Sequence, residues 1–229
     1  MRPSQKSAAD LNTLYFKKRL EKLADNDHEI LAARELKTLR ILERLSGAHF
    51  LLEGASVADI GSGDQFLKPE FEALGMRYNG YDIEDLDIEH DTLPLEDNSQ
   101  DLIISFALLE HLRHPENMFT ESMRCLKKGG SLLINTPNWK YSSDIFFDDY
   151  THVKPYTPQS LRAILLDFGF GDIHDYPNLR CKGDWSYTNK YRYFWANLRP
   201  FSGAPGFSAL IPGLLKGKAK GMFTLAKKL

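Results

Sequence analysis

The chain is organised around one stretch, Val57-Ala58-Asp59-Ile60-Gly61-Ser62-Gly63-Asp64. A short apolar run ends there in an aspartate, a hydrophobic residue and two glycines one residue apart. Glycine allows a strand to turn sharply and allows backbone to approach a ligand closely. A turn of this kind after a buried parallel strand is where open α/β sheets bind nucleotide-like ligands. The same pattern also occurs at ordinary strand-to-helix turns, so the residues that follow must decide between the two interpretations.

A second carboxylate follows at the spacing expected of a nucleotide site. Residues 76–82 predict a second strand that ends in Asp82, about 20 residues after the glycine turn. A carboxylate at the tip of the neighbouring strand accepts hydrogen bonds from a ribose diol. A nicotinamide-dependent oxidoreductase is disfavoured, because its fingerprint needs a third glycine where this chain has Phe66.

Predicted strands alternate with predicted helices along the chain. The strands are expected at 56–60, 77–82, 86–88, 101–106, 131–135 and 171–176 and within 187–197, and the helices at 65–74, 115–126 and 157–168. This alternation favours a parallel sheet covered on both faces. We therefore expect an α/β fold, a Rossmann-like, doubly wound, mostly parallel seven-stranded sheet with helices on both faces. Apolar stripes also predict helix over 8–46, broken at Asp25-Asn26-Asp27 and ended by Ser46-Gly47.

Four short motifs, in a familiar order and spacing, give residues 55–175 their resemblance to a family. They are Leu93-Pro94-Leu95, Asp97-Asn98-Ser99-Gln100-Asp101, Glu110-His111-Leu112 and Leu126-Lys127-Lys128-Gly129-Gly130. With them the chain resembles the class I S-adenosylmethionine (SAM)-dependent methyltransferases, in the type 11/23-like branch. The resemblance implies SAM as cofactor, S-adenosylhomocysteine as its product, and methyl transfer to an acceptor. Many relatives have a third glycine where this chain has Asp64.

The resemblance also implies which residues bind the cofactor. The turn of Gly61, Ser62 and Gly63 is expected to meet the methionine end, with Asp59 orienting the turn. Asp82 is expected to bind the ribose hydroxyls. Ile83 and Leu93 are expected to lie on either side of adenine. Asp91 or Thr92 is expected to accept from the adenine amino group, a role for which Asp87 and Glu89 compete. Phe106 is expected to pack near the sulfonium.

Two histidines compete for the role of general base. His111 follows the predicted strand 101–106, and His152 lies in a long aromatic segment over 137–157 that is expected to act as a lid. Imidazole suits proton removal near neutral pH. His152 is the preferred base, with Asp149 placed to hold its tautomer, whereas a structural hydrogen bond is the alternative for His111. No metal site is expected, because the histidines form no compact ligand motif.

The acceptor is inferred from the residues around His152. The segment 149–158 resembles methyltransferases associated with bacterial surface-sugar and glycolipid pathways, which implies a sugar hydroxyl, including one on a lipid carrier. A quinone-like or other small-molecule acceptor and a non-catalytic SAM-binding subunit are the alternatives. Nucleic acid is disfavoured, because the body of the chain is acidic.

Charge is distributed unevenly along the chain. Residues 185–229 carry eight lysines and arginines and no acidic residue, although the whole chain has a net charge of −2. We expect three parts: an N-terminal helical extension (1–52), a methyltransferase domain (53–199) and a basic amphipathic tail (200–229). The tail either docks on an anionic membrane or packs on the domain. No transmembrane helix and no signal peptide are expected. Cys125 and Cys181 show no metal or redox spacing, so a reduced, cytoplasmic setting is expected.

Overall fold

The computed structural model describes residues 25–178 and 220–229 of the 229-residue chain, with side chains from residue 28 onward. The elements of its first part are α2 (Asp25–Ser46), β1 (Ser56–Ile60), α3 (Lys68–Ala73), β2 (Arg77–Tyr81), β3 (Gln100–Phe106), η1 (Leu109–His111) and α4 (Glu116–Cys125). Those that follow are β4 (Leu126–Pro137), α5 (Trp139–Ser142), η2 (Phe146–Asp148), α6 (Pro158–Asp167), β5 (Phe170–Asn178) and β6 (Gly221–Lys228).

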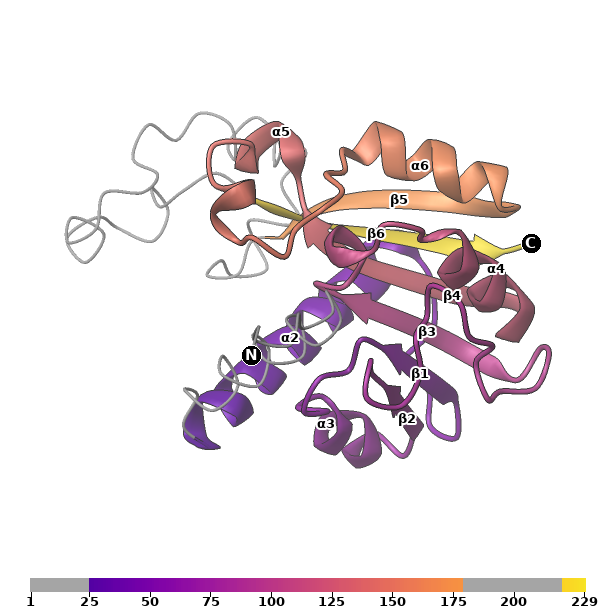
Figure 1. Ribbon diagram of the computed structural model, residues 1–229. Helices are drawn as coiled ribbons and strands as arrows, with labels where there is room; N and C mark the ends of the chain where they lie inside the picture. The colour runs from indigo at the N-terminus through magenta and orange to yellow at the C-terminus, as the bar shows by residue number, and fades with distance from the viewer. Residues whose placement is uncertain (1–24, 179–219) are drawn as a thin grey trace, which may run out of the picture.

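The strands form one mixed sheet in the order β2-β1-β3-β4-β6-β5 (Figure 1). Strands β2, β1, β3 and β4 pair in parallel, and β6 is antiparallel to both of its neighbours. The chain moves from β1 to β2 on one side and then to β3 on the other, so the winding direction reverses at β1. Ligands of open α/β sheets bind at such a reversal, outside the carboxyl ends of the strands.

The predicted Rossmann-like α/β fold is confirmed, and two details of the predicted sheet change. The described residues contain six strands, and the strand expected within 187–197 lies outside them. The strand expected at 86–88 is wrong, because these residues lie in consecutive turns closed by hydrogen bonds to Asp82 O and Asp87 O.

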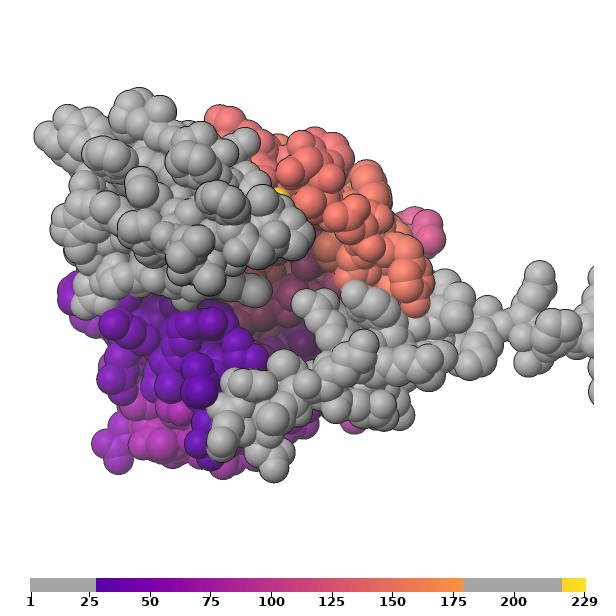
Figure 2. Space-filling model, turned by 90° about the vertical axis from the view of Figure 1, so that its left-hand side faces the viewer, coloured from indigo at the N-terminus to yellow at the C-terminus, as the bar shows by residue number. Residues whose placement is uncertain are grey.

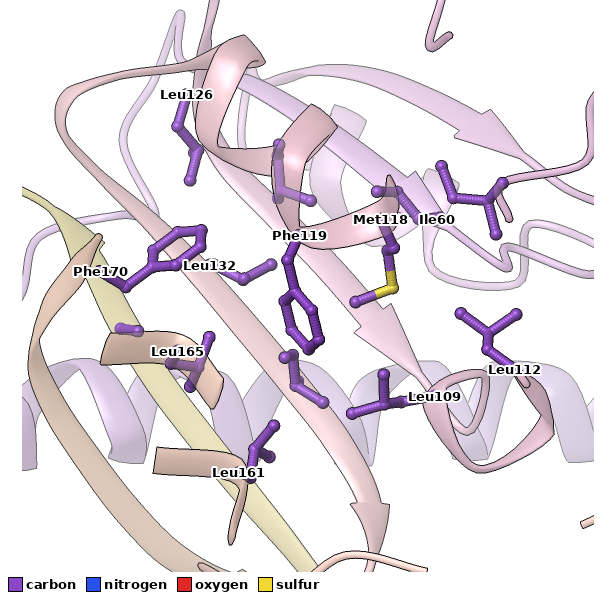
Figure 3. Packing of buried hydrophobic residues seen from close by; sticks show 14 of the residues in the cluster. Ile60, Leu109, Leu112, Met118, Phe119, Leu126, Leu132, Leu161, Leu165 and Phe170 are labelled. Carbon is purple, nitrogen blue, oxygen red and sulfur yellow. The ribbon is translucent and has the colours of Figure 1, made fainter. Parts of the chain in front are cut away.

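Helices cover both faces of the sheet, as the pattern of buried residues shows. Neighbouring residues of a strand point to opposite faces. Val57 and Ile104 therefore belong to a core shared with α2 and α3, while Ala58 and Ile103 belong to a second core shared with α4 and α6. Figure 3 shows this second core, where Phe119 of α4 lies among side chains from β4 and α6.

Helix boundaries follow local capping chemistry. Thr157 caps α6 in a reciprocal capping box with Ser160, and Pro158 occupies its first turn, as predicted. The second predicted helix is α2, whose described part starts at Asp25, and the helix expected before it lies outside the described residues. The predicted helix over 65–74 is the shorter α3.

The aromatic segment 137–157 is a folded substructure and not an open loop. It contains α5 and η2, and its two ends meet in a bridge between Asn138 and Tyr156. Phe146 and Tyr156 are buried, with 1% and 2% of their surface exposed. Side chains on this segment therefore stand at defined positions beside the ends of the strands.

The expectation of a separate tail over 200–229 is wrong for its last residues. Strand β6 lies between β4 and β5, and Met222, Phe223 and Leu225 are 1%, 0% and 0% exposed. Lys227 pairs with Asp172 (Nζ–Oδ2 2.6 Å), and Lys228 donates to backbone carbonyls of α4 and β4. These residues cannot form a membrane-facing surface. Residues 200–219 lie outside the described part of the chain. Among the described residues, no helix is long and apolar enough to cross a membrane.

We predict that β6 is required for folding. Phe223→Ala should lower the free energy of unfolding by about 3–5 kcal/mol, because it removes a fully buried aromatic ring. Chemical denaturation followed by circular dichroism measures this change. Leu166→Ala, at a side chain of α6 that is 56% exposed, is the control and should change stability by less than about 0.5 kcal/mol.

Deleting residues 221–229 should abolish cooperative unfolding altogether, since β5 then loses its only neighbour among the described strands. A truncated protein that melts like the full chain would restore the interpretation of a separate tail.

Candidate cofactor and acceptor site

The glycine turn after β1 is fixed against the ends of both neighbouring strands. Gly61 N and Ser62 N donate to Tyr81 O, at 2.8 and 3.1 Å, at the end of β2. Gly61 has φ +80°, and a Cβ on it would lie 2.9 Å from Leu108 Cβ, in the turn after β3. Only glycine satisfies both conditions. The turns after β1 and β3 therefore touch.

Asp82 completes the turn from the end of β2. Its Oδ2 accepts from Gly63 N at 2.7 Å and its Oδ1 accepts from Ile83 N at 2.7 Å. These two bonds fix the carboxylate, while each oxygen has a second lone pair for another donor. Gly63 and Asp82, which the sequence paired by their spacing, are thus in contact, in an arrangement suited to ribose hydroxyls.

The turn fits a ligand with a polar end. Gly63 has φ +54°, and a Cβ placed on it would have no atom of the described residues within 4 Å. Ser62 Oγ is buried and has no hydrogen-bond partner within residues 25–178 and 220–229. Buried hydroxyls nearly always have partners, so an oxygen of this kind in the glycine turn suits a ligand that supplies one, and it lies toward Gly80 of β2, 2.8 Å from where a Cβ on Gly80 would be.

Asp59 lies beneath the turn and not in it. The residue is 4% exposed, and its Oδ2 accepts a hydrogen bond of 2.6 Å from the Tyr78 hydroxyl of β2. Burial raises the pKa of Asp59 to about 7, opposed by the hydrogen bond from Tyr78 and reinforced by the nearby Asp82 carboxylate. Asp59 therefore ties β1 to β2 directly below the glycines.

Helix α4 holds the loop that contains Leu93. Glu121 Oε2 accepts from Leu93 N at 2.8 Å, and Arg124 donates to Leu93 O at 3.0 Å and to Leu95 O at 2.7 Å. Glu121 and Arg124 also pair with each other at 2.7 Å. Neither residue was predicted from the sequence, although a glutamate and an arginine three positions apart on an amphipathic helix are a detectable signal.

The other residues expected around adenine differ in their surroundings. Leu93 is buried, whereas Ile83 is 39% exposed and Thr92 is exposed. The carboxylate of Asp91 accepts from Asp87 N at 2.8 Å, so it helps to shape the turn that leads to Leu93. Ile83 follows Asp82 at the end of β2, whereas Asp91 and Leu93 are held by side chains of α4, and the contacts of all four residues with adenine remain predictions.

Phe106 ends β3 and packs against the C-terminal strand. Its ring meets Phe223 of β6 edge-on, with ring centroids 5.7 Å apart. Phe106 is only partly buried, so part of its ring packs on the core and part remains accessible at the end of β3. Its predicted place near the sulfonium is compatible with this position.

The two competing histidines are neighbours. The ring centroids of His111 and His152 are 4.8 Å apart. His111 Nδ1 lies 3.0 Å from Thr151 Oγ1 and 3.2 Å from Thr151 O, while His152 Nδ1 lies 2.6 Å from Phe146 O. A carbonyl oxygen only accepts, so each Nδ1 carries the proton and each neutral ring has its lone pair on Nε2.

Asp149 connects the histidines through Thr151. Its Oδ1 accepts from Thr151 Oγ1 at 2.6 Å, and its Oδ2 lies 3.9 Å from His152 Nε2. The tautomer of His152 is therefore set by the Phe146 carbonyl, and Asp149 acts on the opposite side of that ring. The predicted trio of His111, His152 and Asp149 is assembled in one cluster.

Glu110 holds the aromatic segment 137–157 against η1, which brings His152 beside His111. Its backbone carbonyl accepts from Val153 N at 2.8 Å and Lys154 N at 3.2 Å, which docks the aromatic segment on η1. Its side chain is 2% exposed and accepts from Thr136 Oγ1 of β4 at 2.9 Å.

Figure 2 shows this edge of the molecule. A hollow opens there between the indigo atoms of α2 and the salmon atoms of the segment that follows β4. In Figure 1 the arrowheads of β3 and β4 point toward the same side, where α5 lies. The glycine turn and the histidine cluster thus share the carboxyl-terminal edge of the sheet.

A doubly wound sheet with a glycine turn and a ribose-type carboxylate at its carboxyl edge defines an α/β domain of the nucleotide-binding class. Residues 28–175, more than half of the chain, match the family model described as a methyltransferase domain. The chain belongs to this methyltransferase family.

Curated relatives agree with this family over part of the chain. A probable S-adenosylmethionine-dependent methyltransferase of Mycobacterium tuberculosis strain H37Rv is 31% identical over 84 residues, 35% of this chain and 30% of that protein. One from Mycolicibacterium smegmatis is 29% identical over 100 residues, 37% of this chain and 39% of that protein. The matched part thus spans well under half of these relatives.

Solved structures share the fold over much more of the chain. A SAM-dependent methyltransferase from Archaeoglobus fulgidus has a TM-score of 0.57 and 20% identity, covering 85% of this chain and 94% of that one. A phosphoethanolamine N-methyltransferase from Haemonchus contortus, in complex with phosphomonomethylethanolamine and S-adenosylhomocysteine, has a TM-score of 0.57 and 18% identity, covering 99% of this chain and 61% of that one. At these identities the likeness concerns the fold.

Asp82→Ala should weaken binding of SAM and S-adenosylhomocysteine by about 1–3 kcal/mol, because a charged acceptor of hydrogen bonds is lost. Isothermal titration calorimetry measures the effect. Glu72→Ala, on the exposed side of α3, removes the same charge and should leave both affinities unchanged. Equal affinity in the Asp82 variant would remove this residue from the cofactor site.

Asp59→Asn should change how stability depends on pH. The folded-state pKa of about 7 lies above the usual value of 3.8, so this group stabilises the fold below about pH 4 and loses that contribution as pH rises through 7. The wild-type melting temperature should therefore fall more between pH 5 and 8 than that of the variant, in which Asn still accepts from Tyr78. An equal fall in melting temperature for the wild type and the variant between pH 5 and 8 would contradict the raised pKa of Asp59.

Proposed function

We propose that this protein transfers a methyl group from SAM to a hydroxyl group of a sugar or of a lipid-linked glycan. The observation that carries the proposal is the cluster of His111, His152 and Asp149 beside the glycine turn. Leu108, whose Cβ limits the space at Gly61, immediately precedes the η1 turn that contains His111. An acceptor at the histidines is therefore adjacent to the cofactor turn.

The cluster suits an acceptor that must lose a proton. SAM, when bound, supplies a methyl group on a positively charged sulfur, which leaves alignment and proton removal to the protein. In their neutral forms His111 and His152 have the lone pair on Nε2, because their Nδ1 atoms face carbonyl oxygens. A hydroxyl loses its proton to such groups near neutral pH, whereas an amine or a carbon acceptor needs them less.

The surroundings of the cluster support a substrate with flat apolar faces. Phe147 and Tyr150 are 60% and 64% exposed, although both lie within a few residues of His152. Phe147 is supported by Phe146 and Trp139, at centroid distances of 5.0 and 5.8 Å. Held aromatic rings offer surfaces on which a sugar ring packs. They suit a quinone-like acceptor as well, and this alternative must be separated by experiment.

A screen with labelled SAM and purified protein tests the proposal. The acceptors should comprise sugar nucleotides, glycolipids, phenols of the quinol type and small amines, each followed by release of S-adenosylhomocysteine. Transfer to a sugar hydroxyl supports the proposal, and transfer to a phenol alone supports the quinone-like alternative. SAM binding with no transfer to any acceptor favours the non-catalytic SAM-binding subunit.

His152→Ala should lower turnover by about 10²–10⁴-fold and leave SAM affinity unchanged, because proton removal is impaired and the cofactor turn is not. Initial rates and calorimetry on the same sample measure both quantities. His114→Ala replaces an exposed histidine three residues from His111 and should retain wild-type turnover. Undiminished turnover in both His111→Ala and His152→Ala would exclude the cluster from the reaction.

A further inference from the structure

We propose that His28 of α2 is a positioning residue for SAM, which acts on the glycine turn through Asp64. His28 Nδ1 lies 2.8 Å from Asp64 Oδ2, and Asp64 directly follows the turn in the chain. The contact joins the turn to a helix that precedes β1. This role requires SAM as the cofactor and is independent of the acceptor.

Asp64 stands between two residues with left-handed backbone. Gly63 has φ +54° and Gln65 has φ +58°. Glycine adopts such a φ at no steric cost, whereas glutamine adopts it only where the surrounding structure imposes it. Residues 63–65 are therefore held in a shape that local preference alone does not give, and the contacts around them must supply the difference.

Backbone hydrogen bonds impose part of this shape. From the end of β2, Asp82 Oδ2 accepts from Gly63 N at 2.7 Å. Within the turn, Gln65 N donates to Ser62 O at 2.9 Å. The side chain of Asp64, between these two bonds, meets α2 instead. Without that contact, residues 63–65 lose a support that is independent of β2.

Helix α2 is a firm support because its later turns are buried. Leu39 and Leu42 are fully buried in a core that also contains Phe71 of α3. Nearer the start of the helix, Ile30 is 64% exposed. Core packing therefore fixes the helix as a whole, and the pair of His28 and Asp64 links its first described turns to the glycine turn.

Neighbouring carboxylates make a basic partner for Asp64 favourable. Burial raises the pKa of the Tyr78 hydroxyl, and the carboxylates of Asp59 and Asp64 raise it further, which places both carboxylates near that hydroxyl. Carboxylates near one another repel. An ionised carboxylate oxygen only accepts, so the proton between Asp64 and His28 belongs to the imidazole and offsets part of this repulsion. Because the two side chains are 29% and 25% exposed, water screens the pair only in part.

Calorimetry on the full-length protein tests the pair with SAM, S-adenosylhomocysteine and adenosine, the last of which lacks the methionine end. His28→Ala should weaken binding of SAM and S-adenosylhomocysteine by about two- to fivefold, the range of a partly exposed ion pair, and leave adenosine unchanged. Asp64→Ala should do the same, and the double variant should bind no more weakly than either single variant. No acceptor takes part, so failure here is separate from failure of the proposed function.

His28→Asn is the rescue variant, because its amide nitrogen takes the place of the imidazole Nδ1, and it should bind SAM nearly as the wild type does. Glu29→Ala, at the exposed neighbouring position of α2, is the control and should bind all three ligands normally.

The proposal is overturned if His28→Ala binds SAM like the wild type, or if adenosine binding falls equally, which would indicate a general loss of structure. Stronger SAM binding with unchanged S-adenosylhomocysteine binding would also overturn it, since the effect would then be one of charge and not of position.

Discussion

The close approach of the turns after β1 and β3 is the constraint on which the site depends. Gly61 has no room for a side chain, because Leu108 lies where a Cβ would be. With this contact in place, the backbone that faces a cofactor and the η1 turn that carries His111 belong to one rigid edge. Any side chain at Gly61 would separate these turns, and the cofactor and acceptor would no longer be held at a common distance.

The sequence predicted the parts of the fold that depend on local signals. Gly61, Gly63 and Asp82 were paired from their spacing, and Thr157 with Pro158 marked the start of α6 correctly. Strand β6 was not predicted, because a central strand is buried on both faces and so lacks the alternation by which strands are recognised. Its glycine and lysines resemble those of a surface tail. The tertiary contacts of Phe223 and Lys228 decide its place, and no local pattern contains them.

The candidate site was predicted as a set of residues but not as an arrangement. His111 and His152 were treated as rivals, since a sequence offers no distance between residues that far apart. The carbonyl of Glu110 joins them by binding the backbone after His152. Glu121 and Arg124 were missed because they act through the loop at Leu93 and not on a ligand.

The position of β6 also restricts the order in which the sheet assembles. Residues 179–220 separate β5 from β6, yet β6 lies between β4 and β5 and pairs with both. Strand β5 cannot join the sheet before β6 has paired with β4, so the sheet is completed only when residues far apart in the sequence have met. Pairings of such high sequence separation are slow to form. Until they form, the apolar residues of β4 border an unpaired strand edge, the kind of surface on which folding intermediates associate and chaperones act.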